Sequence, residues 1–298
     1  MMIKRIVYLI FIALLLLSGY KFYQSISTSN KLNKALKLAH SKNYQDWKKA
    51  IDILEKDPQK WSSELYTLYE KVAQMAMAKQ NWAEAVYYLK KALKVKPGDP
   101  SATLDLAIST ANLGKATGNQ TLVKEAFELY RKSASLMPDN PLPYYGMGIL
   151  KFWFWDNSPE SKLEGIKWLK EAIEKDPSFV RGYLALARAY YEVEDIPHAL
   201  ETYKKVLEIL PPHGSKTAQV YLNIYRIYRE LQKQTEEAYQ KEELSPSIAG
   251  EDLEVKKLEA LKKAYKADPS NPDVIKALQE EGIRKGTNQR WFQKRKSF

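Results

Sequence analysis

The stretch YTLYEKVAQMAMAKQNWAEAVYYLKKALKVKPGD, residues 66–99, decides the fold of this chain. Its second half carries a small, a bulky and a small residue at Ala85, Leu89 and Ala92, with Pro97 five residues further on. Spacings of four and then three residues place these side chains on one face of an α-helix. Small side chains let a neighbouring helix approach closely, and the proline ends the helix. The stretch therefore predicts two helices packed as a hairpin.

The same pattern recurs before three further prolines, Pro138, Pro177 and Pro211. In each case the three residues lie twelve, eight and five positions before the proline. The matching sets are Ala126, Tyr130 and Ser133; Gly165, Leu169 and Ala172; and Ala199, Tyr203 and Val206. Intervals of 41, 39 and 34 residues between the prolines indicate a repeated helical hairpin. Helix starts agree, because a capping side chain precedes a proline at 99–100, 140–141, 158–159 and 271–272.

Residues 66–99 and 180–213 closely resemble tetratricopeptide repeats, and the resemblance covers residues 31–283. It implies an all-α fold, a right-handed α-solenoid of about five to six helical hairpins. Residues 31–58 read as a degenerate first hairpin. The inserts near 115–123 and 156–162 are expected to be loops between the two helices of their units. Towards the end, the polar stretch 232–252 is expected to split the last unit, with its first helix at 217–231, and residues 273–284 to form a polar capping helix.

The amino-terminal segment predicts contact with a membrane. A short tail, residues 1–5, carries Lys4 and Arg5, and an apolar run follows over residues 6–23. A helix of this length spans roughly 27 Å, close to the ~30 Å hydrocarbon core of a bilayer. We expect a single-pass transmembrane helix that leaves the soluble repeats on the exported, periplasmic side. The alternative is a secretory signal that is cleaved to release a soluble protein.

Composition argues against catalysis. The 298 residues include no Cys and only three His, so thiol chemistry, thiolate metal sites and most imidazole catalysis are excluded or disfavoured. No phosphate-binding glycine loop, no nucleophile elbow and no paired-histidine metal motif is present. We therefore expect a protein that is not an enzyme and needs neither cofactor nor metal.

The resemblance implies that the first helices of the hairpins line a groove that binds a protein or peptide partner. Carried onto this sequence, the candidate groove residues are Glu70, Gln74, Leu104, Ile108, Tyr145, Ile149, Phe152, Arg181, Leu184, Arg188 and Tyr191. The middle of this set is apolar. Arg181 and Arg188 share one helical face, so a ligand with apolar residues and an acidic group near these arginines would fit. Two solvated surface arginines are the alternative interpretation.

Two further segments stand out. The run Phe152-Trp153-Phe154-Trp155 cannot lie on one helical face, so it either covers the core and the following insert or forms a patch for a partner. The tail, residues 284–298, holds six basic side chains and no acid within a chain of net charge +11. Such a tail is typically solvated, while anionic lipid is a possible partner and nucleic acid is disfavoured.

Together these features predict a membrane-anchored repeat scaffold that binds a protein in its groove, in the assembly or maturation of an envelope complex. Bacterial proteins of similar layout include envelope-assembly and cytochrome c maturation factors, a resemblance of architecture. The alternatives are a soluble periplasmic adaptor after signal cleavage, or a binder of nucleic acid or anionic lipid through the tail.

Overall fold

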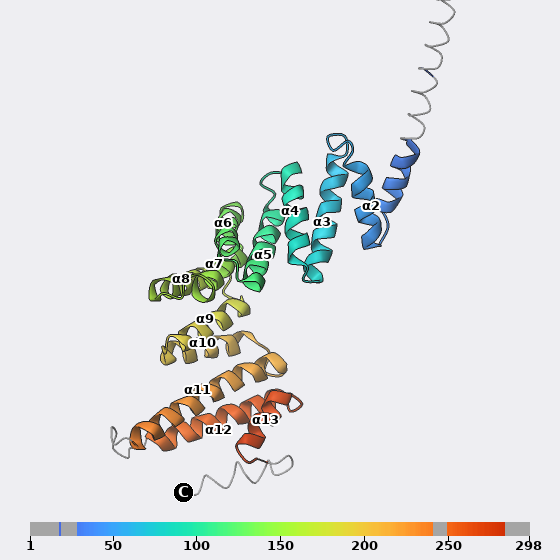
Figure 1. Cartoon of the computed structure of the whole chain (residues 1–298). Coiled ribbons are helices and arrows are strands. Elements are labelled where there is room, and N and C mark those ends of the chain that lie inside the picture. The colour runs from blue at the N-terminus through green and yellow to red at the C-terminus, as the bar shows by residue number, and fades with distance from the viewer. Residues whose placement is uncertain (1–17, 19–28, 241–248, 284–298) are drawn as a thin grey trace, which may run out of the picture. The chain divides into compact units, whose positions relative to one another are not determined.

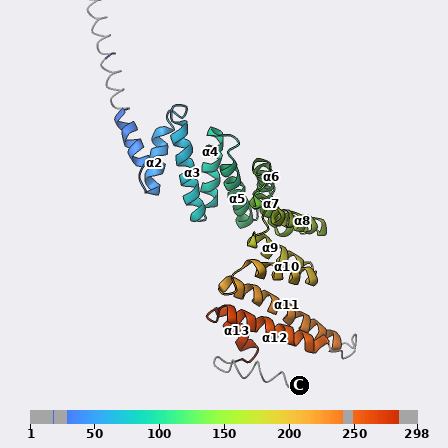
Figure 2. The same cartoon turned by 180° about the vertical axis from the view of Figure 1, so that it is seen from behind.

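The structure, a computed structural model, describes residue 18 and residues 29–240 and 249–283. The regular structure in these residues is helical throughout, with no strand among them. The chain divides into two compact units, Met1–Pro138 and Asp139–Phe298. In each unit, helices that follow one another in sequence pack side by side (Figure 1, Figure 2).

Unit 1 begins, in its described part, with a helix over residues 29–39. The helices that follow are α2 (Tyr44–Leu54), α3 (Ser62–Ala78), α4 (Trp82–Val95), α5 (Pro100–Thr117) and α6 (Gln120–Leu136). One hydrophobic core extends from the first helix to the start of α5, and in it Leu65, Leu68 and Leu89 are at most 2% exposed. The hairpins predicted at residues 66–99 and before Pro138 are therefore confirmed as α3 with α4 and α5 with α6.

Unit 2 continues the same plan. Its helices are α7 (Pro141–Trp153), α8 (Pro159–Lys175), α9 (Val180–Glu192), α10 (Ile196–Ile209), α11 (Ser215–Gln240), α12 (Ala249–Ala267) and α13 (Pro272–Glu280). A second core runs through these helices, with Leu169, Leu222 and Leu261 at most 1% exposed. The pairs α7 with α8, α9 with α10 and α11 with α12 form the hairpins.

The small-residue pattern has the packing role that its spacing predicts. The residues of all four sets are buried on the second helices of their hairpins. Helices α7 and α8 approach each other closely at Gly148 and Gly165. A Cβ added to Gly165 would lie 3.0 Å from the backbone oxygen of Gly148, and one added to Gly148 would lie 3.0 Å from the oxygen of Gly165. Only glycine lets the two backbones come this close.

The predicted helix starts are also confirmed. Asp99, Asn140, Ser158 and Asn271 each precede a proline and each accept a hydrogen bond from a backbone N–H of the first helical turn. At Asp99 the acceptor is Oδ1 and the donor is the N–H of Ala102, at 3.0 Å. These caps satisfy backbone donors that have no partner within the helix.

The inserts differ from expectation. No loop is found at residues 115–123, because α5 continues to Thr117 and α6 begins at Gln120 after a turn at Gly118, whose φ is +65°. The extra residues lengthen the helices, since helix continuation satisfies their backbone hydrogen bonds without a long loop. At the second insert the connection is shorter than predicted and ends where α8 begins at Pro159.

The last hairpin is longer than the sequence predicts. Helix α11 extends to Gln240, so the start of the polar stretch 232–252 is helical, and residues 241–248 lie outside the described part. The predicted capping helix is present as α13.

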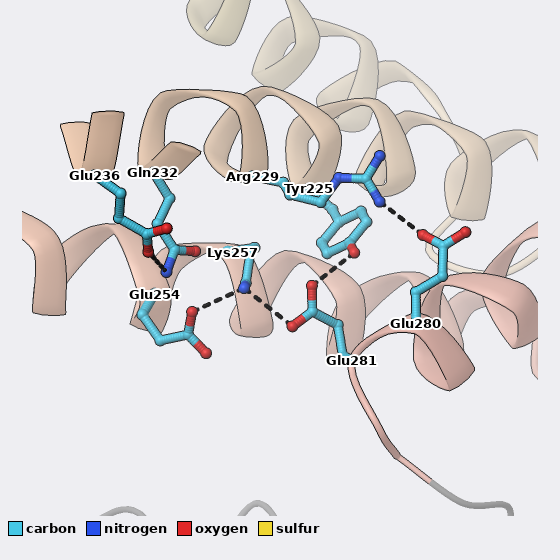
Figure 3. A network of polar contacts seen from close by, with 8 residues as sticks. All are labelled: Tyr225, Arg229, Gln232, Glu236, Glu254, Lys257, Glu280 and Glu281. Atoms are coloured by element: carbon cyan, nitrogen blue, oxygen red, sulfur yellow. Dashed lines mark hydrogen bonds and ion pairs between the residues drawn. The ribbon is translucent and has the colours of Figure 1, made fainter. Parts of the chain in front are cut away.

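A polar network between α11, α12 and the end of α13 fixes that capping helix (Figure 3). Lys257 on α12 is 6% exposed and pairs with Glu254 at 2.8 Å and with Glu281 at 3.0 Å. Glu281 also accepts a hydrogen bond from the Tyr225 hydroxyl at 2.8 Å. A lysine is accommodated because two carboxylates compensate its buried charge.

The aromatic run divides between core and surface. Phe152 is 1% exposed and belongs to the core, whereas Phe154 is 39% exposed. The ammonium of Lys151 lies 3.9 Å from the centroid of the Trp155 ring.

No helix in the described residues combines the length and apolar character needed to cross a membrane. The predicted anchor at 6–23 lies outside these residues except for Ser18, as does the tail 284–298.

Candidate functional site

A groove on unit 2 runs between the first helices of two consecutive hairpins, α7 and α9. It encloses a volume of about 470 Å³. Apolar side chains line most of it, and two arginines from α9 complete the lining. The residues are Tyr145, Ile149, Trp153 and Phe154 from α7 and its end, and Arg181, Leu184, Ala185 and Arg188 from α9. Apolar lining with few charged groups is typical of binding pockets.

One half of the groove is ordered around Phe179, which immediately precedes α9. The Tyr145 ring packs edge-on against Phe179, with centroids 5.5 Å apart and an interplanar angle of 88°. The guanidinium carbon of Arg181 lies 5.4 Å from the centroid of the same Phe179 ring. Burial raises the pKa of Tyr145 against the opposing effect of Arg181, so its hydroxyl stays protonated at neutral pH. The phenol can therefore donate a hydrogen bond to a ligand.

The other half is ordered around Glu192 at the end of α9. Trp153 Nε1 donates to one carboxylate oxygen at 2.8 Å, and Arg188 Nε donates to the other at 2.8 Å. The guanidinium of Arg188 also lies over the Trp153 ring, 5.3 Å from its centroid. The Arg188 side chain is nevertheless 65% exposed, so its charge remains accessible to a ligand in the groove.

The structure brings together five of the residues predicted for the groove: Tyr145, Ile149, Arg181, Leu184 and Arg188. Phe152 is the main correction. It is buried against Gly165, whose Cα faces it so closely that an added Cβ would lie 2.7 Å from the Phe152 Cβ. Trp153 takes the groove position instead, a residue that the sequence analysis missed. Counting in steps of four from Tyr145 through Ile149 leads to Trp153, so helical spacing could have found it.

The remaining predicted residues lie elsewhere. Tyr191 is 37% exposed and lines a different pocket, towards α11. On unit 1, Leu104 is only 8% exposed and belongs to the buried side chains, so it is withdrawn from the groove surface. Gln74 is exposed, Ile108 is half-buried, and Glu70 accepts a hydrogen bond from the Tyr66 hydroxyl at 2.7 Å. These unit 1 residues do not line the groove described above.

Within the described part of the chain, no three His, Asp or Glu side chains converge to hold a metal ion. The groove residues offer apolar contact, a phenol donor and two cations. This set can bind a ligand through burial and charge, and it contains no nucleophile paired with a base.

The fold and the groove define a class: this is a protein of the tetratricopeptide-repeat fold, an all-α solenoid of helical hairpins. No family model matches the chain. The structure of PilW, described as a widely conserved type IV pilus biogenesis factor, matches with a TM-score of 0.54 at 15% identity. The match covers 85% of this chain and 98% of PilW. At that identity the likeness shows the fold alone.

Two curated relatives match part of the chain. Human interferon-induced protein with tetratricopeptide repeats 2 is 33% identical over 132 residues, 44% of this chain. The Haemophilus influenzae protein named as the cytochrome c-type biogenesis protein CcmH is 27% identical over 125 residues, 42% of this chain. The matched segment spans 27% of the length of each relative, so the chain resembles a part of them.

Proposed function

We propose that this protein is a scaffold that binds another protein through the groove between α7 and α9. The observation that carries the proposal is the combination of an apolar groove with two arginines on one of its walls. The ligand is a peptide segment with apolar side chains next to an acidic group. No bond is made or broken in this function, and its mechanism is binding.

The physical basis is burial joined to charge. Apolar side chains of a ligand are buried against Ile149, Leu184 and the Trp153 ring. Each Å² of apolar surface removed from water in this way makes the binding free energy more favourable by roughly 25 cal/mol. Arg181 and Arg188 are seven residues apart on α9, about 10.5 Å along the helix axis. A carboxylate placed against either one forms a charge-assisted hydrogen bond, and at exposed arginines such a pair contributes up to about 1 kcal/mol. A wrong ligand with a cation at this position is repelled, so the arginines supply selectivity.

The wider role that we propose is the assembly or maturation of a complex at a membrane. The apolar run 6–23 supports anchoring, with the repeats on the exported side. The name of the CcmH relative concerns cytochrome c-type biogenesis, which supports an assembly role by analogy. Alkaline extraction of membranes from cells that express the full chain tests the anchor: a chain released in soluble form would refute it.

Selection of binding sequences tests the groove. The full chain in detergent is presented with a phage-displayed library of random peptides, and enriched peptides should carry Asp or Glu beside apolar residues. The charge-reversed variant Arg181→Glu/Arg188→Glu should lose these sequences.

A matched control reverses two other exposed arginines, Arg131→Glu/Arg226→Glu, with the same change in net charge. This control should retain the selected peptides. If the groove variant keeps the same peptides as the unmodified chain, or if no acidic preference is found, the assignment of the groove is wrong.

A further inference from the structure

A second pocket of unit 2 lies between the turn from α9 to α10 and the C-terminal half of α11. Its volume is about 440 Å³. Its lining combines an apolar part, Ile196, Ile227 and Leu231, with three carboxylates, Glu192, Glu194 and Glu230. Ile227 is 2% exposed and forms the floor. No residue lines both this pocket and the groove between α7 and α9, although Glu192 of the pocket accepts hydrogen bonds from Trp153 and Arg188 of the groove. The occupant inferred for the pocket is independent of the function proposed for that groove.

The pocket carries uncompensated negative charge. Glu192 forms an ion pair with Arg188, whose Nε lies 2.8 Å from a carboxylate oxygen of Glu192. Among the residues that the structure describes, neither Glu194 nor Glu230 forms an ion pair, and no Lys or Arg lines the pocket. Like charges on one wall repel each other, and a cation placed between them removes this cost. A pocket lined by apolar residues and carboxylates therefore fits an occupant that carries both cationic groups and apolar side chains.

Glu194 is held at the rim by the backbone. Its φ is +61°, a left-handed conformation that glycine adopts most easily. The N–H of Glu194 bonds to the oxygen of Tyr191 at 3.1 Å, and the N–H of Asp195 bonds to the oxygen of Tyr190 at 2.9 Å. This pair of hydrogen bonds closes the C-terminus of α9 and fixes where the Glu194 side chain begins.

The described chain ends against α11, the helix that also forms one wall of this pocket. Tyr225 donates to Glu281 at 2.8 Å, and Arg229 pairs with Glu280 at 2.7 Å, which holds the end of α13 against α11 (Figure 3). Both partners on α11 are within two helical turns of Glu230 and Leu231 on the same helix. After Ile283 the chain has fifteen more residues, which can reach about 50 Å when extended. A helix with its side chains is only about 10–12 Å across, so this segment can pass around α11 to the pocket.

We propose that residues 284–298 of the same chain occupy this pocket. The segment, RKGTNQRWFQKRKSF, holds six basic residues, no acid and three aromatic rings. Trp291 and Phe292 pack on the apolar floor, and the neighbouring cations pair with Glu194 and Glu230. Attachment to the same chain raises the effective concentration of the segment at the pocket to the millimolar range, so weak individual contacts are sufficient.

Cross-linking of the full chain tests this proposal directly. The protein contains no Cys, so two introduced thiols are the only ones present. One is placed at the pocket by Gln234→Cys, since Gln234 is exposed and lines it, and one in the tail by Ser297→Cys. A bismaleimide should join them within one chain about tenfold faster than it joins Ser297→Cys to Glu160→Cys, an exposed position on α8. Equal rates for the two pairs would overturn the proposal.

The size of the product identifies the occupant. A cross-linked monomer supports docking within one chain. A cross-linked dimer that forms at the same rate would show that the tail of a second copy fills the pocket, which would also overturn the proposal.

Charge variants separate specific docking from general attraction. Glu194→Gln/Glu230→Gln in the pair at 234 and 297 should slow the cross-link about fivefold or more. The matched variant Glu208→Gln/Glu259→Gln removes two other exposed carboxylates of unit 2 and should leave the rate unchanged. If both variants slow the reaction equally, the tail is attracted by overall charge and the pocket is not its site. Circular dichroism of each variant confirms that the helices are intact.

Discussion

Replacement of Gly165 by alanine tests whether backbone contact between α7 and α8 sets the packing of unit 2. The new Cβ would lie 2.7 Å from the Cβ and 2.8 Å from the backbone nitrogen of Phe152, and 3.0 Å from the Gly148 oxygen. Two of these three obstacles are main-chain atoms, and the third is attached to the main chain. No side-chain rotation can relieve the contact, so α7 and α8 must move apart.

The expected magnitude follows from two opposing effects. Overpacking of a filled core costs about 1–3 kcal/mol, and rigid backbone obstacles place this site near the upper end. Alanine in place of glycine in a helix stabilises by about 1 kcal/mol. We therefore expect a net loss of about 2 kcal/mol in the free energy of unfolding of unit 2. For a unit of this size the loss corresponds to a decrease in Tm of about 4–8 °C.

The assay is denaturation of the full chain in urea and by heat, followed by circular dichroism at the helical band. Gly182→Ala is the matched control, because its nearest obstacle at 2.7 Å is the Phe179 ring, a side chain that can shift. We expect this control to change the free energy of unfolding by less than about 1 kcal/mol. A Gly165→Ala protein as stable as the unmodified chain, or more stable, would refute the argument from close backbone approach.

Three further changes test the polar contacts. Lys257→Met leaves Glu254 and Glu281 without their shared cation and should lower the free energy of unfolding by about 3–5 kcal/mol in urea titration, whereas Lys263→Met, an exposed control, should change it little. Burial and the hydrogen bond to Glu281 raise the pKa of Tyr225 to about 12. Because the folded-state pKa lies above the usual value near 10, the stabilisation is present below about pH 10 and is lost as the pH rises towards 12. Tyr225→Phe should reduce this alkaline loss of stability, and an unchanged pH dependence would contradict the assignment. Asp99→Ala removes the cap of α5 and should lower stability by about 1 kcal/mol in thermal denaturation, and a neutral result would show that the cap contributes nothing.

The repeat could be predicted because its signals are local. Helical spacing places Ala85, Leu89 and Ala92 on one face whatever the rest of the chain does, and Asp99 can cap α5 with atoms only three residues away. The loop predicted at 115–123 was wrong, because no local signal in this stretch distinguishes a longer helix from a loop. A length excess in a repeat does not say whether a helix grows or a loop forms, and here the helix grows because its backbone hydrogen bonds continue.

The groove was found in part. Tyr145, Ile149 and Leu184 follow from which face of a first helix is exposed, but Phe152 was placed there in error. Helical spacing from Tyr145 and Ile149 favours Trp153, whose side chain lies one helical step of about 100° from that of Phe152. The close approach of Gly165 to Phe152 decides which of them is buried.

The amino-acid sequence by itself determined that this protein is an array of helical hairpins, where four of its helices begin, and which small residues face their neighbours. These properties depend on spacings of three and four residues and on hydrogen bonds within one turn. Only the tertiary structure decided that Lys257 is buried between Glu254 and Glu281, that Trp153 and Arg188 meet at Glu192, and that a pocket rich in carboxylates forms against α11. The decisive contacts, Lys257 with Glu281 and Trp153 with Glu192, join residues 24 and 39 positions apart, and their energies depend on burial and on the charge of neighbours that packing alone brings together.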